Sequence, residues 1–113
     1  MLVVDDDPGI RETMADILSE MDFKVTTASD GYQAIDIVKG GSFDAIVMDI
    51  RMPGIDGIET LKHIKKTTTR AKCILMTAYA TKDAVLAARR EGATSLLYKP
   101  IDIPQLVTLL KEG

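Results

Sequence analysis

The chain has 113 residues, of which 46% are hydrophobic and 27% are charged, the size and balance of one water-soluble domain. The formal net charge of −3 argues against direct nucleic acid binding by this domain, because phosphate contacts need clustered Lys and Arg. A single cysteine, Cys73, excludes an intrachain disulfide and suits a buried position in a reducing compartment. No apolar run approaches the roughly 20 residues that span a bilayer. We therefore expect a cytoplasmic protein with no membrane association.

The first half of the chain alternates short apolar runs with amphipathic segments. An apolar run at residues 2–4 predicts a buried strand. Asp7 followed by Pro8 then predicts the cap and first position of a helix that extends to about residue 21. The next elements, in order, are a strand at 24–28, a turn at 29–31, a helix that stops at Gly40–Gly41 and a strand at 45–48.

The second half repeats this alternation after a break at Pro53–Gly54. Asp56 and Glu59 have the spacing of a capping box, which predicts a helix that continues through Ile64. The elements that follow are a strand at 73–76, a helix at 82–91 with a left-handed Gly92 after it, a strand at 95–98 and a helix from the Asp102–Gln105 pair to about 111.

This order predicts an α/β fold, in which a parallel sheet is covered by helices on both faces and the crossovers are right-handed. We expect one compact domain over residues 1–113. The short lead-in before the first strand also fits a domain excised from a longer protein.

Residues whose side chains could bind a ligand or react follow the predicted strands. In a parallel sheet the carboxyl ends of the strands meet at one edge, where ligands bind. The residues expected there are Asp5, Asp6 and Asp7, then Asp49, then Thr77 and Ala78, and finally Lys99–Pro100. Clustered carboxylates resist ionising beside one another, and Mg²⁺ prefers a few carboxylate oxygens with retained waters. We predict a Mg²⁺ site, with Mn²⁺ as a substitute, at Asp5, Asp6 and Asp49. For Asp7 we prefer a helix cap to metal ligation.

The chemistry predicted for this edge is nucleophilic. Asp49 would attack a phosphodonor through an in-line transition state, and the metal and Lys99 would stabilise that state. The Thr77 hydroxyl and the Ala78 backbone N–H would hold further phosphoryl oxygens.

Together these motifs resemble the receiver domain of response regulators in two-component signalling systems. The matching segments are residues 2–8, 48–54, 76–78 and 98–100. The resemblance covers the whole chain and implies a flavodoxin-like fold with strand order 2-1-3-4-5. It implies phosphoryl transfer from a kinase phosphohistidine to Asp49, which becomes 4-aspartylphosphate. It also implies that Asp5, Asp6 and the backbone carbonyl of Arg51 hold the metal, that Lys99 binds phosphate, and that the Lys99–Pro100 bond is cis.

The chain departs from the family at the position three residues before the lysine, which is usually aromatic and is Leu96 here. The usual coupling between that aromatic residue and the threonine is therefore in question. Tyr98 shares a strand face with Leu96, so Thr77, Leu96 and Tyr98 are the switch candidates, and our hypothesis is that Tyr98 partly takes over the aromatic role. Arg51 and Tyr79 are large, and we predict that they shield the acyl phosphate from water; two exposed surface side chains remain an equal interpretation.

The resemblance implies a signalling switch that catalyses only its own phosphorylation and dephosphorylation, not a turnover enzyme. Expected partners are a sensor histidine kinase or phosphotransfer protein, and an output domain or partner protein on the face formed by residues 82–91, 95–98 and the last helix. A phosphorylation-linked dimer is left open. One alternative is a Mg²⁺-dependent phosphohydrolase with an aspartyl-phosphate intermediate, which is disfavoured because Arg51 stands where a second Asp is usual. The other is a phosphorylation-independent pseudo-receiver, which is disfavoured because no acid and no lysine of the set is missing.

Overall fold

The structure is a computed structural model that describes residues 1–68, 70–79 and 81–112, so Gly113, the last residue of the predicted domain, lies outside it. Strands and helices alternate in the predicted order. Their bounds are β1 Leu2–Val4, α1 Pro8–Glu20, β2 Thr26–Ala28, α2 Gly31–Gly40, β3 Ala45–Asp49, α3 Gly57–Thr67, β4 Lys72–Thr77, α4 Lys82–Arg90, β5 Ser95–Tyr98 and α5 Ile103–Lys111. Among these residues, no helix has the length and apolar character needed to cross a membrane.

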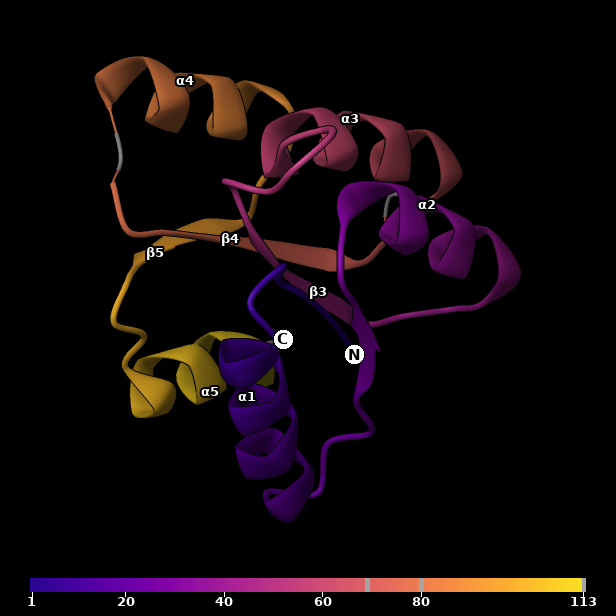
Figure 1. The fold of residues 1–113 in the computed structure, drawn as a ribbon, viewed down its shortest axis with the longest axis vertical. Helices are drawn as coiled ribbons and strands as arrows, with labels where there is room; N and C mark the ends of the chain where they lie inside the picture. Colours follow the sequence, from indigo (N-terminus) through magenta and orange to yellow (C-terminus); the bar gives the residue numbers. More distant parts are fainter. Residues whose placement is uncertain (69, 80, 113) are drawn as a thin grey trace.

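The strands form one parallel sheet in the order β2-β1-β3-β4-β5, which confirms the expected flavodoxin-like topology. Helices α1 and α5 cover one face, and α2, α3 and α4 cover the other (Figure 1). All five strands therefore end at the same edge of the sheet, and the loops that follow β1, β3, β4 and β5 meet there.

Alternate residues along the central strands supply two separate hydrophobic cores, as the two-residue period of a strand requires. Ile46 and Met48 of β3 pack toward α2, α3 and α4. Val47, which lies between them, packs toward α1 and α5. Because β1, β3 and β4 are buried on both faces, their sequences are continuous apolar runs rather than alternating ones.

Helix caps follow the predicted chemistry. The Asp7 side chain accepts from the N–H groups of Gly9 and Ile10 at the start of α1. Asp56 accepts from the N–H of Glu59 at 2.8 Å, but the Glu59 carboxylate lies 3.5 Å from His63, so only half of a capping box forms. Gly92 follows α4 with φ +98°, the left-handed conformation expected of a helix C-cap glycine.

The largest difference from the sequence prediction lies in the second strand. The sequence predicts a strand over residues 24–28, but β2 begins at Thr26, where pairing with Leu2 of β1 begins. Residues before Thr26 have no β1 partner, because β1 itself begins at Leu2. The carbonyl of Lys24 instead accepts from the N-terminal ammonium.

Candidate functional site

Three carboxylates meet at the carboxyl edge of the sheet, as predicted. Asp5 follows β1 directly and Asp49 is the last residue of β3, and these strands are neighbours with Val4 opposite Met48. Asp5, Asp6 and Asp49 each place a carboxylate oxygen within 4.8 Å of the others. Asp5 is fully buried, Asp49 is 6% exposed and Asp6 is exposed, so the cluster opens to solvent on the side of Asp6.

Lys99 pairs with both buried acids. Its Nζ lies 2.8 Å from Oδ2 of Asp49 and 3.1 Å from Oδ2 of Asp5, so one ammonium bridges both carboxylates. Burial of the ammonium would lower the pKa of Lys99, but the hydrogen bonds and negative charges of Asp49 and Asp5 outweigh it and raise the pKa above its ordinary value of 10.5. The Lys99–Pro100 bond that follows is cis, which confirms that expectation.

The other oxygen of each buried carboxylate is held by the backbone. Oδ1 of Asp5 accepts from the N–H of Asp7 at 2.9 Å, and Oδ1 of Asp49 accepts from the N–H of Arg51 at 3.1 Å. Both carboxylates are therefore fixed in orientation by one backbone donor and one shared ammonium. The Asp7 carboxylate is used as the cap of α1, which is the role preferred for it.

Thr77 ends β4 opposite Tyr98 of β5 and is 1% exposed. Its hydroxyl donates to the carbonyl of Tyr79 at 2.9 Å and accepts from the Tyr79 N–H at 3.1 Å. The N–H of Ala78 has no acceptor among the residues that the structure describes. Thr77 must therefore give up its bond to the Tyr79 carbonyl before it can donate to an anion at the site, whereas the Ala78 N–H is available.

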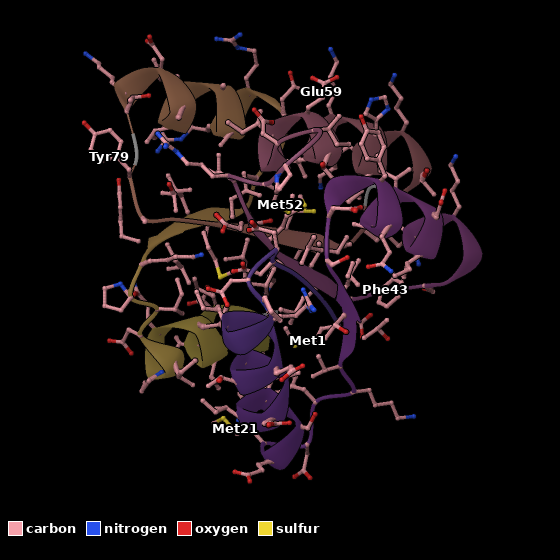
Figure 2. The ribbon with its side chains drawn as sticks, viewed as in Figure 1. Met1, Met21, Phe43, Met52, Glu59 and Tyr79 are labelled. Atoms are coloured by element: carbon pink, nitrogen blue, oxygen red, sulfur yellow. The ribbon has the colours of Figure 1, made fainter. Side chains whose placement is uncertain are left out.

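A contact between two loops lies beside the cluster. The guanidinium carbon of Arg51, in the loop after β3, lies 5.6 Å from the ring centroid of Tyr79, in the segment before α4. Tyr79 is 68% exposed and projects outward beside α4 (Figure 2). The two side chains predicted to shield the site thus contact each other in cation–π geometry.

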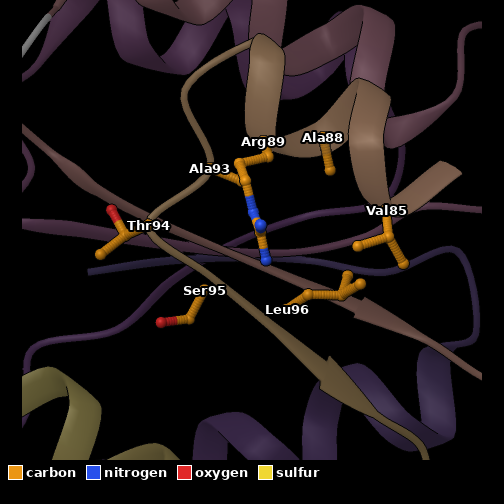
Figure 3. A pocket seen from close by; sticks show the side chains of 7 residues that line it. All are labelled: Val85, Ala88, Arg89, Ala93, Thr94, Ser95 and Leu96. Carbon is orange, nitrogen blue, oxygen red and sulfur yellow. The ribbon is translucent and has the colours of Figure 1, made fainter. Parts of the chain in front are cut away.

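Leu96 and Tyr98 differ sharply in environment. Leu96 packs against the core beneath α4 and lines a cavity of about 80 Å³ between α4 and β5, together with Val85 and Arg89 (Figure 3). Tyr98 is 60% exposed and is not among the residues that line this cavity. The switch role of Tyr98 remains a hypothesis.

Sequence reasoning missed two residues that shape the site. Nη1 of Arg11 donates to the backbone carbonyl of Asp5 at 2.8 Å. A Cβ on Gly57, at the start of α3, would lie 2.3 Å from the Asp49 carbonyl oxygen. Neither contact leaves a signal in the sequence, because each joins a residue to the backbone of another segment.

The donor set fits a small, hard cation. It consists of carboxylate oxygens, the ligand type that Mg²⁺ and Ca²⁺ prefer, and it combines two buried acids with one exposed acid. Asp5, Asp6 and Asp49 would hold such a cation and leave open positions toward solvent.

Comparison with known proteins agrees with this geometry. The family model described as response regulator receiver domain matches residues 1–111. The chain is 34% identical over 112 residues to sporulation initiation phosphotransferase F of Bacillus subtilis, covering 99% of this chain and 90% of that protein. It is 38% identical over 113 residues to transcriptional regulatory protein ZraR of Klebsiella oxytoca, covering all of this chain but only 26% of that protein.

A solved structure of a receiver domain has the same fold as this chain. The CheY-like response regulator receiver domain protein of Methanospirillum hungatei is 26% identical, with a TM-score of 0.94 over 97% of this chain and 88% of that one. Sheet order, site geometry and family match agree, and the chain belongs to the response regulator receiver domain family.

Proposed function

We propose that residues 1–113 form one phosphoacceptor receiver domain and that Asp49 takes a phosphoryl group from a phosphohistidine on a partner protein. The observation that carries this proposal is the bridge from Lys99 to Asp5 and Asp49 within the acidic cluster. An ammonium in this position can exchange a carboxylate for a phosphoryl oxygen without leaving the site.

Asp49 acts as the nucleophile. One of its carboxylate oxygens forms the new P–O bond while the P–N bond to the donor imidazole breaks, and the imidazole nitrogen keeps the electron pair. The bonds from the Arg51 N–H and the Lys99 ammonium hold the carboxylate in place before the donor arrives. This preorganisation removes part of the entropic cost of the reaction.

A bound Mg²⁺, with Mn²⁺ as a substitute, would supply positive charge against the phosphoryl oxygens and lower the repulsion between them and the acids. Asp5, Asp6 and Asp49 would hold it, with the backbone carbonyl of Arg51 as the further protein contact. Lys99 and the Ala78 N–H would bind phosphoryl oxygens, and the Thr77 hydroxyl would join them after leaving Tyr79.

This exchange by Thr77 links the site to the surface. The phosphoryl group of an aspartyl phosphate carries about −1.5 to −2 charges in place of the single negative charge of the Asp49 carboxylate, and this larger charge favours the hydroxyl turned toward Asp49. That turn breaks the bond to the Tyr79 carbonyl and loosens the segment that leads into α4. We propose that the α4–β5–α5 face has two arrangements, and that one of them binds an output domain or a partner protein.

The proposed partners are a sensor histidine kinase or a phosphotransfer protein as donor, and an effector as receiver of the signal. The domain reacts once per phosphorylation event and so acts as a switch rather than as an enzyme with turnover. The chain spans about a quarter of ZraR and most of phosphotransferase F, so both a larger regulator and a separate receiver are precedents for its context.

The test is intact-mass spectrometry after incubation with acetyl phosphate and Mg²⁺. We expect one added phosphate on the wild-type chain and on Asp36→Ala, which removes an exposed acid of α2. We expect none on Asp49→Ala or without Mg²⁺. The absence of any adduct, together with no beryllofluoride binding, would support a pseudo-receiver instead. Phosphate release over many turnovers would support a phosphohydrolase.

A further inference from the structure

Arg11 makes an unusual contact for a side chain in the first turns of a helix. Its Nη1 reaches back to the backbone carbonyl of Asp5 at 2.8 Å. Asp5 is fully buried, and no backbone N–H among the described residues donates to this carbonyl. A buried carbonyl without a donor is costly, so the guanidinium satisfies a group that the sheet leaves unpaired where β1 ends.

The segment Asp5–Asp6–Asp7 is held by hydrogen bonds on both sides of Asp6. On one side, the N–H of Asp5 donates to Ala28 of β2 at 3.2 Å, and its carbonyl accepts from Arg11. On the other side, Asp7 donates its N–H to the Asp5 carboxylate at 2.9 Å and caps α1. The Asp6 side chain has no hydrogen-bond partner in the part of the chain that the structure describes. Its position in the cluster is thus set by the backbone on either side.

We propose that Arg11 is a positioning residue for the acidic segment: it connects the end of β1 to α1 and so holds Asp5 and Asp6 in the arrangement that binds the cation. The proposal rests on the proposed function, because it assumes that the cluster takes Mg²⁺. A guanidinium suits this task because it is always charged and its planar fork loses little freedom on bonding. Groups that orient metal ligands in this way commonly change metal affinity by about 10- to 100-fold when they are removed.

The charge of Arg11 and its positioning role predict opposite changes in Mg²⁺ affinity when the side chain is removed, so the two roles can be told apart. Arg11 has no carboxylate within 4.0 Å among the described residues, so it is not neutralised by an ion pair. A positive charge near a divalent cation repels it, and its removal without any structural effect would tighten Mg²⁺ binding. Loss of positioning would weaken binding. The sign of the change therefore separates the two roles.

The experiment measures Mg²⁺ affinity by isothermal titration calorimetry for the wild-type chain, Arg11→Met and Arg11→Lys. Glu12→Gln is the control, because Glu12 is the exposed neighbour of Arg11 on the same helix. We expect affinity to fall about tenfold in Arg11→Met and less in Arg11→Lys, which keeps a donor and the charge. In the control, removal of an exposed negative charge, which solvent and salt screen, should leave affinity within about twofold.

A second measurement needs no metal. Amide hydrogen exchange without Mg²⁺ should be faster at Asp5 and Asp7, whose N–H groups are hydrogen-bonded, in Arg11→Met than in the wild type, and unchanged in Glu12→Gln. Equal or tighter Mg²⁺ binding together with unchanged exchange would overturn the positioning role. If Arg11→Met does not fold, Arg11→Lys decides by the same two measurements. A wild-type chain that binds no Mg²⁺ would refute the proposed function instead, and the exchange rates would still decide whether Arg11 orders the segment.

Discussion

Gly57 offers the most direct test of how the fold fixes the phosphoacceptor. It is the first residue of α3, and its N–H donates to the carbonyl of Ile50 at 2.6 Å. A Cβ at this position would lie 2.3 Å from the Asp49 carbonyl oxygen and 2.8 Å from the Ile50 Cα. Both are backbone atoms, so no side-chain rotation relieves the overlap. In Gly57→Ala, α3 must move away from the end of β3.

The cost can be estimated from this geometry. Overpacking that forces backbone shifts usually costs about 1–3 kcal/mol. For a domain of this size each kcal/mol lowers Tm by roughly 4 °C, so we expect Tm to fall by about 4–12 °C. Because the overlapped carbonyl oxygen belongs to Asp49, the fraction phosphorylated by acetyl phosphate should also fall under conditions where the variant is folded.

Gly40→Ala is the matched control. Gly40 ends α2, and no heavy atom of another segment lies within 4 Å of the position that a Cβ would occupy there. The same chemical change should therefore be neutral or stabilise by up to about 1 kcal/mol. Thermal and urea unfolding of both variants measure the difference. A Gly57→Ala chain as stable as Gly40→Ala, with normal phosphorylation, would refute the close approach of α3 to Asp49.

Further predictions concern single side chains. Lys99→Met should lower the free energy of unfolding at neutral pH. Because the pKa of Lys99 is raised in the folded state, the difference in unfolding free energy between variant and wild type should persist below pH 10.5 and disappear as the pH rises through the folded pKa. Urea unfolding at a series of pH values measures this difference. Arg51→Ala and Tyr79→Ala should each shorten the lifetime of the phosphorylated form in a mass-spectrometric time course, and unchanged lifetimes would contradict the shielding role. Cys73 is 1% exposed and burial raises its pKa despite the opposing effect of a nearby lysine, so native-state alkylation by iodoacetamide should be at least about tenfold slower than in urea. Tyr98 should change rotamer when beryllofluoride binds, and NMR that finds one rotamer throughout would end that hypothesis.

Local chemistry explains how much of the fold was predictable. Caps such as Asp7 and Asp56 and the glycine after α4 act within a few residues, so the sequence marks them directly. The bounds of β2 were predicted least accurately, because β2 is an edge strand whose extent depends on its one partner, β1. Its length is decided by pairing rather than by its own residues.

The acidic cluster was predictable for a different reason. In a parallel sheet every strand ends at the same edge, so the alternation of strands and helices was enough to place Asp5, Asp49, Thr77 and Lys99 along one edge of the sheet. The resemblance to receiver domains supplied the strand order, which alternation alone leaves open.

The sequence by itself determined the order of elements, the helix caps and the set of residues at the carboxyl edge, because these depend on neighbouring residues and on the direction of the strands. Only the tertiary structure decided that Lys99 bridges two buried carboxylates, that Thr77 is bound to the Tyr79 backbone, and that Arg11 reaches the Asp5 carbonyl. These contacts depend on the register and separation of segments that are remote in the chain or on side-chain orientation. Packing of the whole domain sets those quantities, and no local pattern records them.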